Sequence, residues 1–254
     1  MNSEDYKKTW MDQVHKLFDK ADDHEDWNNR GIALFNSSRY EEAIESFDKT
    51  LQIKPDYHWG WYNRGNALLM SGSLEQAIES FDKALQLKAD LHDAWNNRGA
   101  ALMNLGRLEQ AIESFDKTLQ IKADLHDVWS NRGVALRQLG RLEQAVKSFD
   151  KALQLGADKH ETWHNRGAVL GELGRLEAAI ENFDKALQFK PDSHEVWSDR
   201  ALALGQLGRY EQAIENYDKA LESKHAMPLV IAIFQILDII MNFVALLAVF
   251  VKMA

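Results

Sequence analysis

The five residues Trp95-Asn96-Asn97-Arg98-Gly99 decide the fold, because close variants of them recur along the chain at a fixed distance. Each copy begins with a tryptophan 34 residues after the last: Trp27, Trp61, Trp95, Trp129, Trp163 and Trp197. A strict period of this length is typical of solenoids, in which each unit buries its apolar face against its neighbours. The sequence therefore predicts one elongated repeat domain.

Each predicted unit contains two amphipathic helical stretches and almost no strand pattern. In the third unit, the first stretch runs from about Leu91 to Asn104 and ends at Gly106, because glycine adopts the left-handed conformation at low cost. The second stretch runs from about Leu108 to Lys122. We expect acidic N-caps at the starts of the first helices, namely Asp22, Asp56, Asp90, Asp124, Asp158 and Asp192.

The unit resembles the tetratricopeptide repeat, whose pattern is W-x2-L-G-x2-Y, then A-x3-F, then P. In the third unit Trp95, Gly99, Ala111 and Phe115 match this pattern, and Asp-Lys follows the aromatic residue. The chain is thus similar to an array of the W-x-N-R-G and F-D-K subtype. The resemblance implies an all-α, right-handed superhelix (an α-solenoid) of helix-turn-helix units. Six units are expected, at residues 24–57, 58–91, 92–125, 126–159, 160–193 and 194–227.

Arginine departs from the family pattern, because it stands where the pattern has leucine before the glycine. A charge in an apolar position needs a partner. The candidate partners are aspartates that follow the aromatic residue once per unit: Asp48, Asp82, Asp116, Asp150, Asp184 and Asp218. We therefore predict Arg to Asp pairs between stacked helices.

An asparagine precedes this arginine in five units, and stacking at constant pitch lines up Asn29, Asn63, Asn97, Asn131 and Asn165. The resemblance implies that first-helix residues line a concave groove, where such a row can hold a partner's peptide backbone by two-way hydrogen bonds. The alternative is an amide bonded to a neighbouring helix terminus. Side chains that vary beside the row are expected to set selectivity: Tyr62, Asn66, Asn96 and His164.

Composition limits the function further. The net charge of −9 argues against nucleic acid, and the absence of cysteine excludes disulfides and thiol nucleophiles. The sequence has no nucleophile elbow, phosphate loop or zinc motif, so we expect no enzyme, no cofactor and no metal site. The histidines that open the units lie one repeat apart, too far to share an ion.

The two ends differ from the repeats. Residues 1–23 predict an amphipathic helix that caps the first unit. Residues 228–254 predict a hydrophobic C-terminal helix, in which residues 229–251 are long enough to cross a bilayer. Its polar residues Gln235, Asp238 and Asn242 form one narrow wedge, which we expect to face another helix through self-association or a partner's transmembrane helix.

The predicted function is a non-catalytic scaffold that holds a partner peptide or helix in its concave groove. The C-terminal helix would tether it to a membrane, with the repeats in the cytoplasm. In the alternative, the protein is a soluble cytoplasmic scaffold or regulatory subunit, and the C-terminal helix caps the solenoid or forms an oligomer interface.

Overall fold

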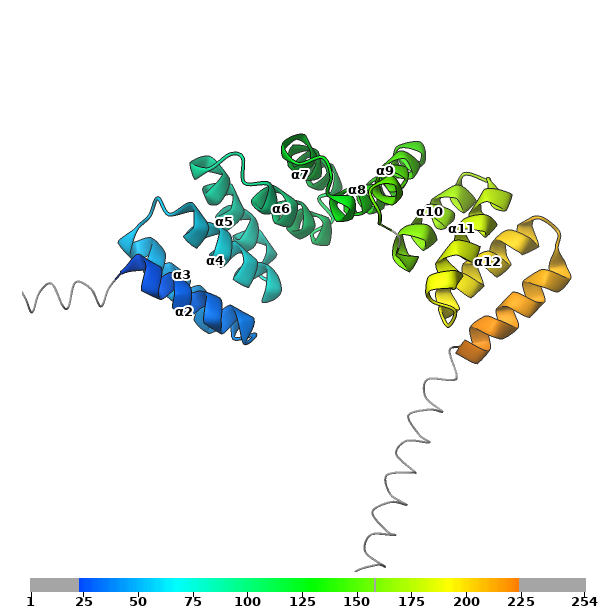
Figure 1. Ribbon diagram of the computed structural model, residues 1–254, viewed down its shortest axis with the longest axis horizontal. Coiled ribbons are helices and arrows are strands. Elements are labelled where there is room, and N and C mark those ends of the chain that lie inside the picture. The colour runs from blue at the N-terminus through cyan, green and yellow to red at the C-terminus, as the bar shows by residue number, and fades with distance from the viewer. Residues whose placement is uncertain (1–22, 158, 224–254) are drawn as a thin grey trace, which may run out of the picture. The chain divides into compact units, whose positions relative to one another are not determined.

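The computed structural model describes residues 23–157 and 159–223, which form helices and no strand. The described helices run in chain order along two compact units, which divide between Arg141 and Leu142 (Figure 1). The first unit holds α2 (His24–Asn36), α3 (Tyr40–Ile53), α4 (His58–Met70), α5 (Leu74–Leu87), α6 (His92–Asn104), α7 (Leu108–Ile121) and α8 (His126–Gln138). The second holds α9 (Leu142–Gln154), α10 (His160–Glu172), α11 (Leu176–Phe189), α12 (His194–Gln206) and a last helix over residues 210–223.

Several predictions from the sequence lie outside the described residues. These are the N-terminal cap helix, apart from Asp23, and the hydrophobic C-terminal helix with its wedge of Gln235, Asp238 and Asn242. The unit boundaries and the right-handed superhelix also stay predictions. The all-helical fold is confirmed for the described part of the chain.

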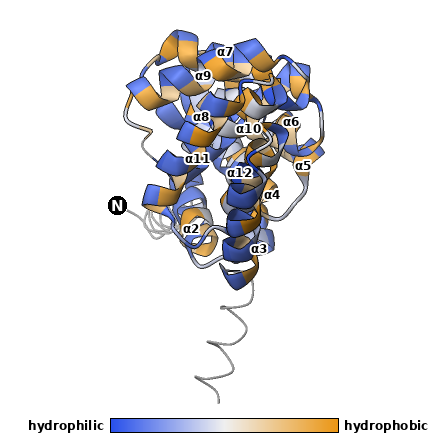
Figure 2. Ribbon diagram, turned by 90° about the vertical axis from the view of Figure 1, so that its right-hand side faces the viewer, coloured by the Kyte–Doolittle hydropathy of each residue, from blue (hydrophilic) through white to orange (hydrophobic). Residues whose placement is uncertain are grey.

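Within the first unit, the helices form two layers. Helices α2, α4, α6 and α8 contact one another in sequence, whereas no contact of that closeness joins α3 to α5 or α5 to α7 among the described residues. The layer whose helices lie closer together is the inner side of a curved stack. Figure 2 shows hydrophobic and hydrophilic residues along each helix, as expected of amphipathic helices that bury one face.

A phenylalanine packed on a glycine lies in the core of the pairs α2–α3, α4–α5, α6–α7 and α10–α11. Phe81 and Phe115 are completely buried in α5 and α7. A Cβ atom added to Gly65 would lie 2.6 Å from the Phe81 ring, and one added to Gly99 would lie 2.6 Å from Phe115. The glycine of the repeated motif is therefore required by close packing, since real Cβ atoms do not approach so closely.

The predicted acidic N-caps are wrong, because each first helix begins one residue later than expected. The observed caps are Asp23, Tyr57, Leu91, Leu125, Lys159 and Ser193. Among them only Asp23 accepts a side-chain hydrogen bond, from the Glu25 N–H at 3.2 Å. The predicted aspartates precede the caps, and Asp22 and Asp158 lie outside the described residues.

Hydrogen bonds from tryptophan side chains, and not from acidic caps, hold the starts of these first helices. The indole N–H of Trp95 donates to the carbonyl of Ala89 at 2.9 Å, six residues earlier in the loop between helices. The same bond joins Trp61 to Pro55, Trp129 to Ala123 and Trp197 to Pro191. These tryptophans are half-buried, and their indole bonds fasten α4, α6, α8 and α12 to the preceding loops.

The turn between the two helices of a pair ends as predicted at Gly106, whose φ of +72° is left-handed. There the Arg107 N–H donates to the Leu102 carbonyl at 2.9 Å and closes the end of α6. In the first pair Ser38 holds this position at a φ of +60° without being glycine.

The predicted Arg to Asp pairs are confirmed wherever both partners are described. Each arginine donates from Nε to the aspartate of the preceding second helix at 2.6–2.8 Å, in the pairs Arg64–Asp48, Arg98–Asp82, Arg132–Asp116, Arg166–Asp150 and Arg200–Asp184. The Arg98 side chain is 20% exposed and that of Asp82 is 43% exposed, so the pair is partly solvated. Each Arg to Asp pair joins helices of successive 34-residue repeats.

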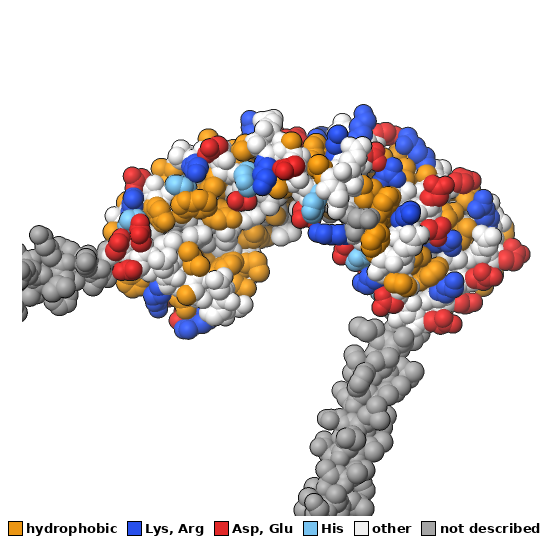
Figure 3. All heavy atoms as spheres, in the orientation of Figure 1, with side chains coloured by type: hydrophobic (Ala, Val, Ile, Leu, Met, Phe, Trp, Pro, Cys, Tyr) orange, Lys and Arg blue, Asp and Glu red, His pale blue; other side chains and the backbone are white. Residues whose placement is uncertain are grey.

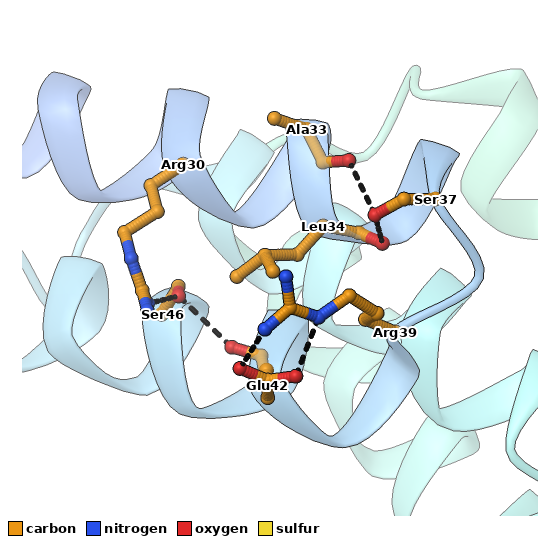
Figure 4. A network of polar contacts seen from close by, with 7 residues as sticks. All are labelled: Arg30, Ala33, Leu34, Ser37, Arg39, Glu42 and Ser46. Carbon is orange, nitrogen blue, oxygen red and sulfur yellow. Dashed lines mark hydrogen bonds and ion pairs between the residues drawn. The ribbon is translucent and has the colours of Figure 1, made fainter.

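A second bond from the same arginine was not predicted. Arg98 Nη1 donates to Ser114 Oγ at 2.7 Å, and this hydroxyl donates to the Gln110 carbonyl at 2.9 Å. Figure 4 shows the same arrangement in the first pair, where Arg30 of α2 reaches Ser46 of α3. The available signal was the 34-residue period of this position, which holds Ser46, Ser80, Ser114, Ser148, Asn182 and Asn216.

Candidate protein-binding surface of the first helices

The predicted asparagine row lies on the first helices, which form the inner layer of the first unit. Asn29 is exposed on α2, whereas Asn63, Asn97 and Asn131 are half-buried on α4, α6 and α8. In the second unit Asn165 is half-buried on α10.

The row is bonded from helix to helix in the first unit. Asn63 Nδ2 donates to Asn28 Oδ1 at 3.0 Å, which ties α4 to α2. Asn97 Nδ2 donates to Asn66 Oδ1 at 2.8 Å, which ties α6 to α4, and Asn96 Nδ2 donates to Asn97 Oδ1 at 3.1 Å. The partners of Asn63 and Asn97 are therefore side chains within the neighbouring first helices, not helix termini. A primary amide has two N–H donors and an acceptor with two lone pairs, so one such bond leaves capacity for a ligand.

Tyr62 belongs to a group of aromatic side chains in the second predicted repeat, residues 58–91. Its ring lies 5.7 Å from Trp59 and 6.2 Å from Phe81, and the Trp59 ring lies 5.1 Å from His58. Burial raises the pKa of the Tyr62 phenol and lowers the pKa of the His58 imidazole. Both rings are therefore uncharged near neutral pH.

Exposed apolar side chains continue this run over the inner layer. Trp59 is 38% exposed, Ile32 is 37% exposed and Met70 is 55% exposed. In the view of Figure 3, hydrophobic side chains gather over the part of the molecule where Figure 1 places α2, α4 and α5. Large aromatic and thioether side chains of this kind are the usual anchors of protein interfaces.

In the second compact unit, which begins at Leu142, the surface of the first helices differs from that of α2, α4 and α6. His164 Nε2 lies 2.7 Å from Asp199 Oδ2, which ties α10 to α12. A pocket of about 170 Å³ lies beside this pair and is lined by residues that include Ala168, Gly171 and Leu202. Gly171 brings no side chain into this pocket, and a Cβ atom added to it would lie 3.9 Å from Cβ of Ala179.

Residues 23–157 and 159–223 show neither a metal site nor a membrane span. No group of His, Cys, Asp or Glu side chains there is arranged to hold a metal ion. No helix of this part is long and apolar enough to cross a membrane, and the predicted span at residues 229–251 lies beyond it.

Family models agree with the repeated helix pairs. A tetratricopeptide repeat model matches residues 25–57, 92–125 and 194–225, another matches residues 124–192, and a TPR repeat model matches residues 65–106. Together these matches cover well over half of the chain. The protein belongs to the tetratricopeptide repeat family.

Particular proteins resemble the chain in fold. A crystal structure of MamA has 22% sequence identity, covers 65% of this chain and 96% of its own, and superimposes with a TM-score of 0.63. MamA from Desulfovibrio magneticus RS-1 has 19% identity, coverages of 66% and 96%, and a TM-score of 0.64. YrrB, described as a TPR protein with an unusual peptide-binding site, has 22% identity, coverages of 74% and 98%, and a TM-score of 0.64. No curated protein matches the sequence.

Proposed function

We propose that the inner layer formed by α2, α4 and α6 binds a peptide segment of a partner protein, without catalysis. The observation that carries this proposal is one face of α4, on which the half-buried Asn63 and Asn66 and the exposed Trp59 and Met70 recur at steps of three and four residues. The amides supply donors and acceptors for a peptide backbone, and the anchors supply apolar contact for its side chains. YrrB, a protein of similar fold, has a peptide-binding site by its description, which supports the same use here.

The experiment selects ligands with the full chain and a displayed peptide library, because the partner is unknown. Selected peptides are then measured against the variants Trp59→Ala and Met70→Ser. We expect each change to weaken binding about tenfold, the loss of roughly 1.4 kcal/mol typical of an interface anchor. Both side chains are more than a third exposed, so the variants should fold.

Leu87→Ser provides a matched control, because Leu87 is 45% exposed at the end of α5, in the second-helix layer. Binding should be unchanged in this variant. Selected peptides that bind the Trp59→Ala and Met70→Ser proteins as well as the unaltered chain would refute the proposed surface.

Six units in a right-handed superhelix, with a membrane tether at residues 229–251, remain the finer predictions of the sequence. Fractionation of the full chain with and without detergent tests the tether. Recovery of a monodisperse protein without detergent would contradict it.

A further inference from the structure

A groove of about 640 Å³ lies between the second helices α3 and α5 of the first compact unit, with α4 behind them. We call it the outer groove. Trp61 of α4 lines it. At about 100° per residue, Trp61 lies on the opposite side of α4 from Asn63 and Asn66. The outer groove is therefore separate from the peptide surface around Trp59.

The walls of the outer groove carry carboxylates that keep hydrogen-bonding capacity. Asp48 Oδ1 accepts from Arg64 Nε at 2.6 Å, and Asp82 Oδ1 accepts from Arg98 Nε at 2.7 Å. A carboxylate has two oxygens with about four acceptor sites, so one such bond leaves acceptors for a ligand. The two aspartate side chains are 44% and 43% exposed, and Glu79 is exposed on α5. Water and ligands thus reach all three carboxylates.

Charge differs between the two layers of the first compact unit. Helices α3, α5 and α7 carry ten acidic residues and three lysines, whereas α2, α4, α6 and α8 carry four acidic residues and five arginines. The basic residues that cap the second helices stand at the helix ends, outside the lining of the outer groove: Arg39, Lys54, Lys88, Arg107 and Lys122. The middle of the outer layer therefore attracts cations.

We propose that the outer groove binds an arginine or lysine side chain of a partner protein. The carboxylates hold its charged head by charge-assisted hydrogen bonds, and Leu51 and the Trp61 ring pack against its aliphatic stem. Lys83 also lines the groove, and its positive charge opposes this ligand.

The lining of the groove recurs one repeat later, which favours a protein segment as the ligand. All nine lining residues have a residue of the same type 34 positions further on, and the charged ones become Asp82, Arg98, Glu113, Asp116 and Lys117. The bonds recur as well, since Arg64 donates to Ser80 at 2.7 Å and Arg98 donates to Ser114 at 2.7 Å. Two like sites at a fixed interval suit a chain with basic residues at intervals, because the two contacts reinforce each other.

Binding of a basic peptide to the full chain tests the proposal. The probe is a fluorescein-labelled peptide of four Arg-Gly dipeptides, and fluorescence anisotropy measures its affinity at about 0.1 M salt. Glu79→Gln should weaken binding about threefold and Lys83→Gln should strengthen it about threefold, because each removes one charge from an exposed side chain of the groove. The double variant Glu79→Gln and Glu113→Gln should weaken binding about tenfold.

Glu41→Gln is the matched control, because it makes the same change of charge outside the groove. Glu41 is exposed in the first turn of α3, about 10 Å along the helix from Asp48, which is about the screening length at this salt concentration. Binding should be unchanged in this variant and in Trp59→Ala.

Four results would overturn the proposal. These are equal losses in Glu41→Gln and Glu79→Gln, no gain in Lys83→Gln, a loss in Trp59→Ala, or tighter binding of the free polyamine spermine than of the peptide. The first two would show attraction without a defined site, the third would move the peptide to the inner layer, and the fourth would replace the protein segment by a small cation. Peptides selected for the surface around Trp59 are measured separately, so the two proposals fail separately.

Discussion

Arg98 shows how one residue joins two units. Its guanidinium lies 5.7 Å from the centre of the Trp95 ring, bonds to Asp82 of the preceding second helix, and bonds to Ser114 of the following one. Three kinds of contact thus hold a charge in a position where the family pattern has leucine. The sequence predicted the carboxylate from its matching period. It did not predict the hydroxyl, because serine is common on helices and only the folded geometry shows which serines point at the arginine.

Replacing Arg98 by leucine should lower the free energy of unfolding by about 1–2 kcal/mol, because a charge-assisted bond is lost while Asp82 keeps partial access to water. Thermal melting of the single variants and of the double variant with Asp82→Ala measures the coupling between the two side chains. If the effects of the two changes simply add, the pair contributes nothing beyond its separate residues. That result would contradict the role assigned to it.

Gly65→Ala should destabilise the protein by about 1–3 kcal/mol, because the new methyl group would overlap the buried Phe81 ring. This cost exceeds the gain of about 1 kcal/mol that alanine brings inside a helix. Gly205→Ala is the matched control, since its Cβ would lie 4.0 Å from Cβ of Ala213, an ordinary van der Waals contact. Denaturant unfolding should show loss in the first variant and no loss in the second.

The helix starts show where local sequence rules give way to packing. Aspartate before an apolar run favours an N-cap, yet each described first helix begins later and most caps have no side-chain bond. The tryptophan bond to the loop carbonyl fixes the start instead. Such a bond depends on the path of the loop back to the helix, and helix propensities of single residues do not predict that path. The helix lengths followed from periodicity, because the apolar faces and the left-handed glycines mark them directly.

Ala89→Pro should stabilise the protein by about 0.4–1 kcal/mol. Proline already stands at the equivalent position 55, where its carbonyl accepts the same indole bond. The preceding residues also match, since Lys54 has φ −135° and ψ 85° and Lys88 has φ −144° and ψ 91°, an extended conformation that proline favours before it. The melting temperature should rise in this variant and fall sharply for Ala100→Pro, inside α6. A lower melting temperature for Ala89→Pro would show that the loops differ.

At the scale of the molecule, each described helix pair contacts only the neighbouring pairs of its own compact unit. The strict period made the repeat fold predictable, because a solenoid is specified by its unit and needs no distant pairing. The binding surface was less predictable. The period identified the asparagine row, but the bonds from Asn63 to Asn28 and from Asn97 to Asn66 depend on side-chain direction between stacked helices.

Deleting residues 92–125 should leave a folded protein with a lower melting temperature. The deletion joins Leu91 to His126 and brings Arg132 into the position of Arg98, opposite Asp82, so the contacts between units are restored. Circular dichroism should show helical content reduced in proportion to the residues removed. Deleting residues 92–108 instead removes half a unit and should abolish cooperative unfolding. Equal behaviour of the two deletions would contradict the modular contacts.

The arginine and aspartate of one unit serve different neighbours, and this gives the array a direction. Arg98 faces backward along the chain to Asp82, while Asp116 faces forward to Arg132. An internal unit thus carries one outgoing and one incoming half of the same connection. Gene duplication of a whole unit leaves both halves matched at each new junction, so such a protein can change length during evolution without any compensating substitution.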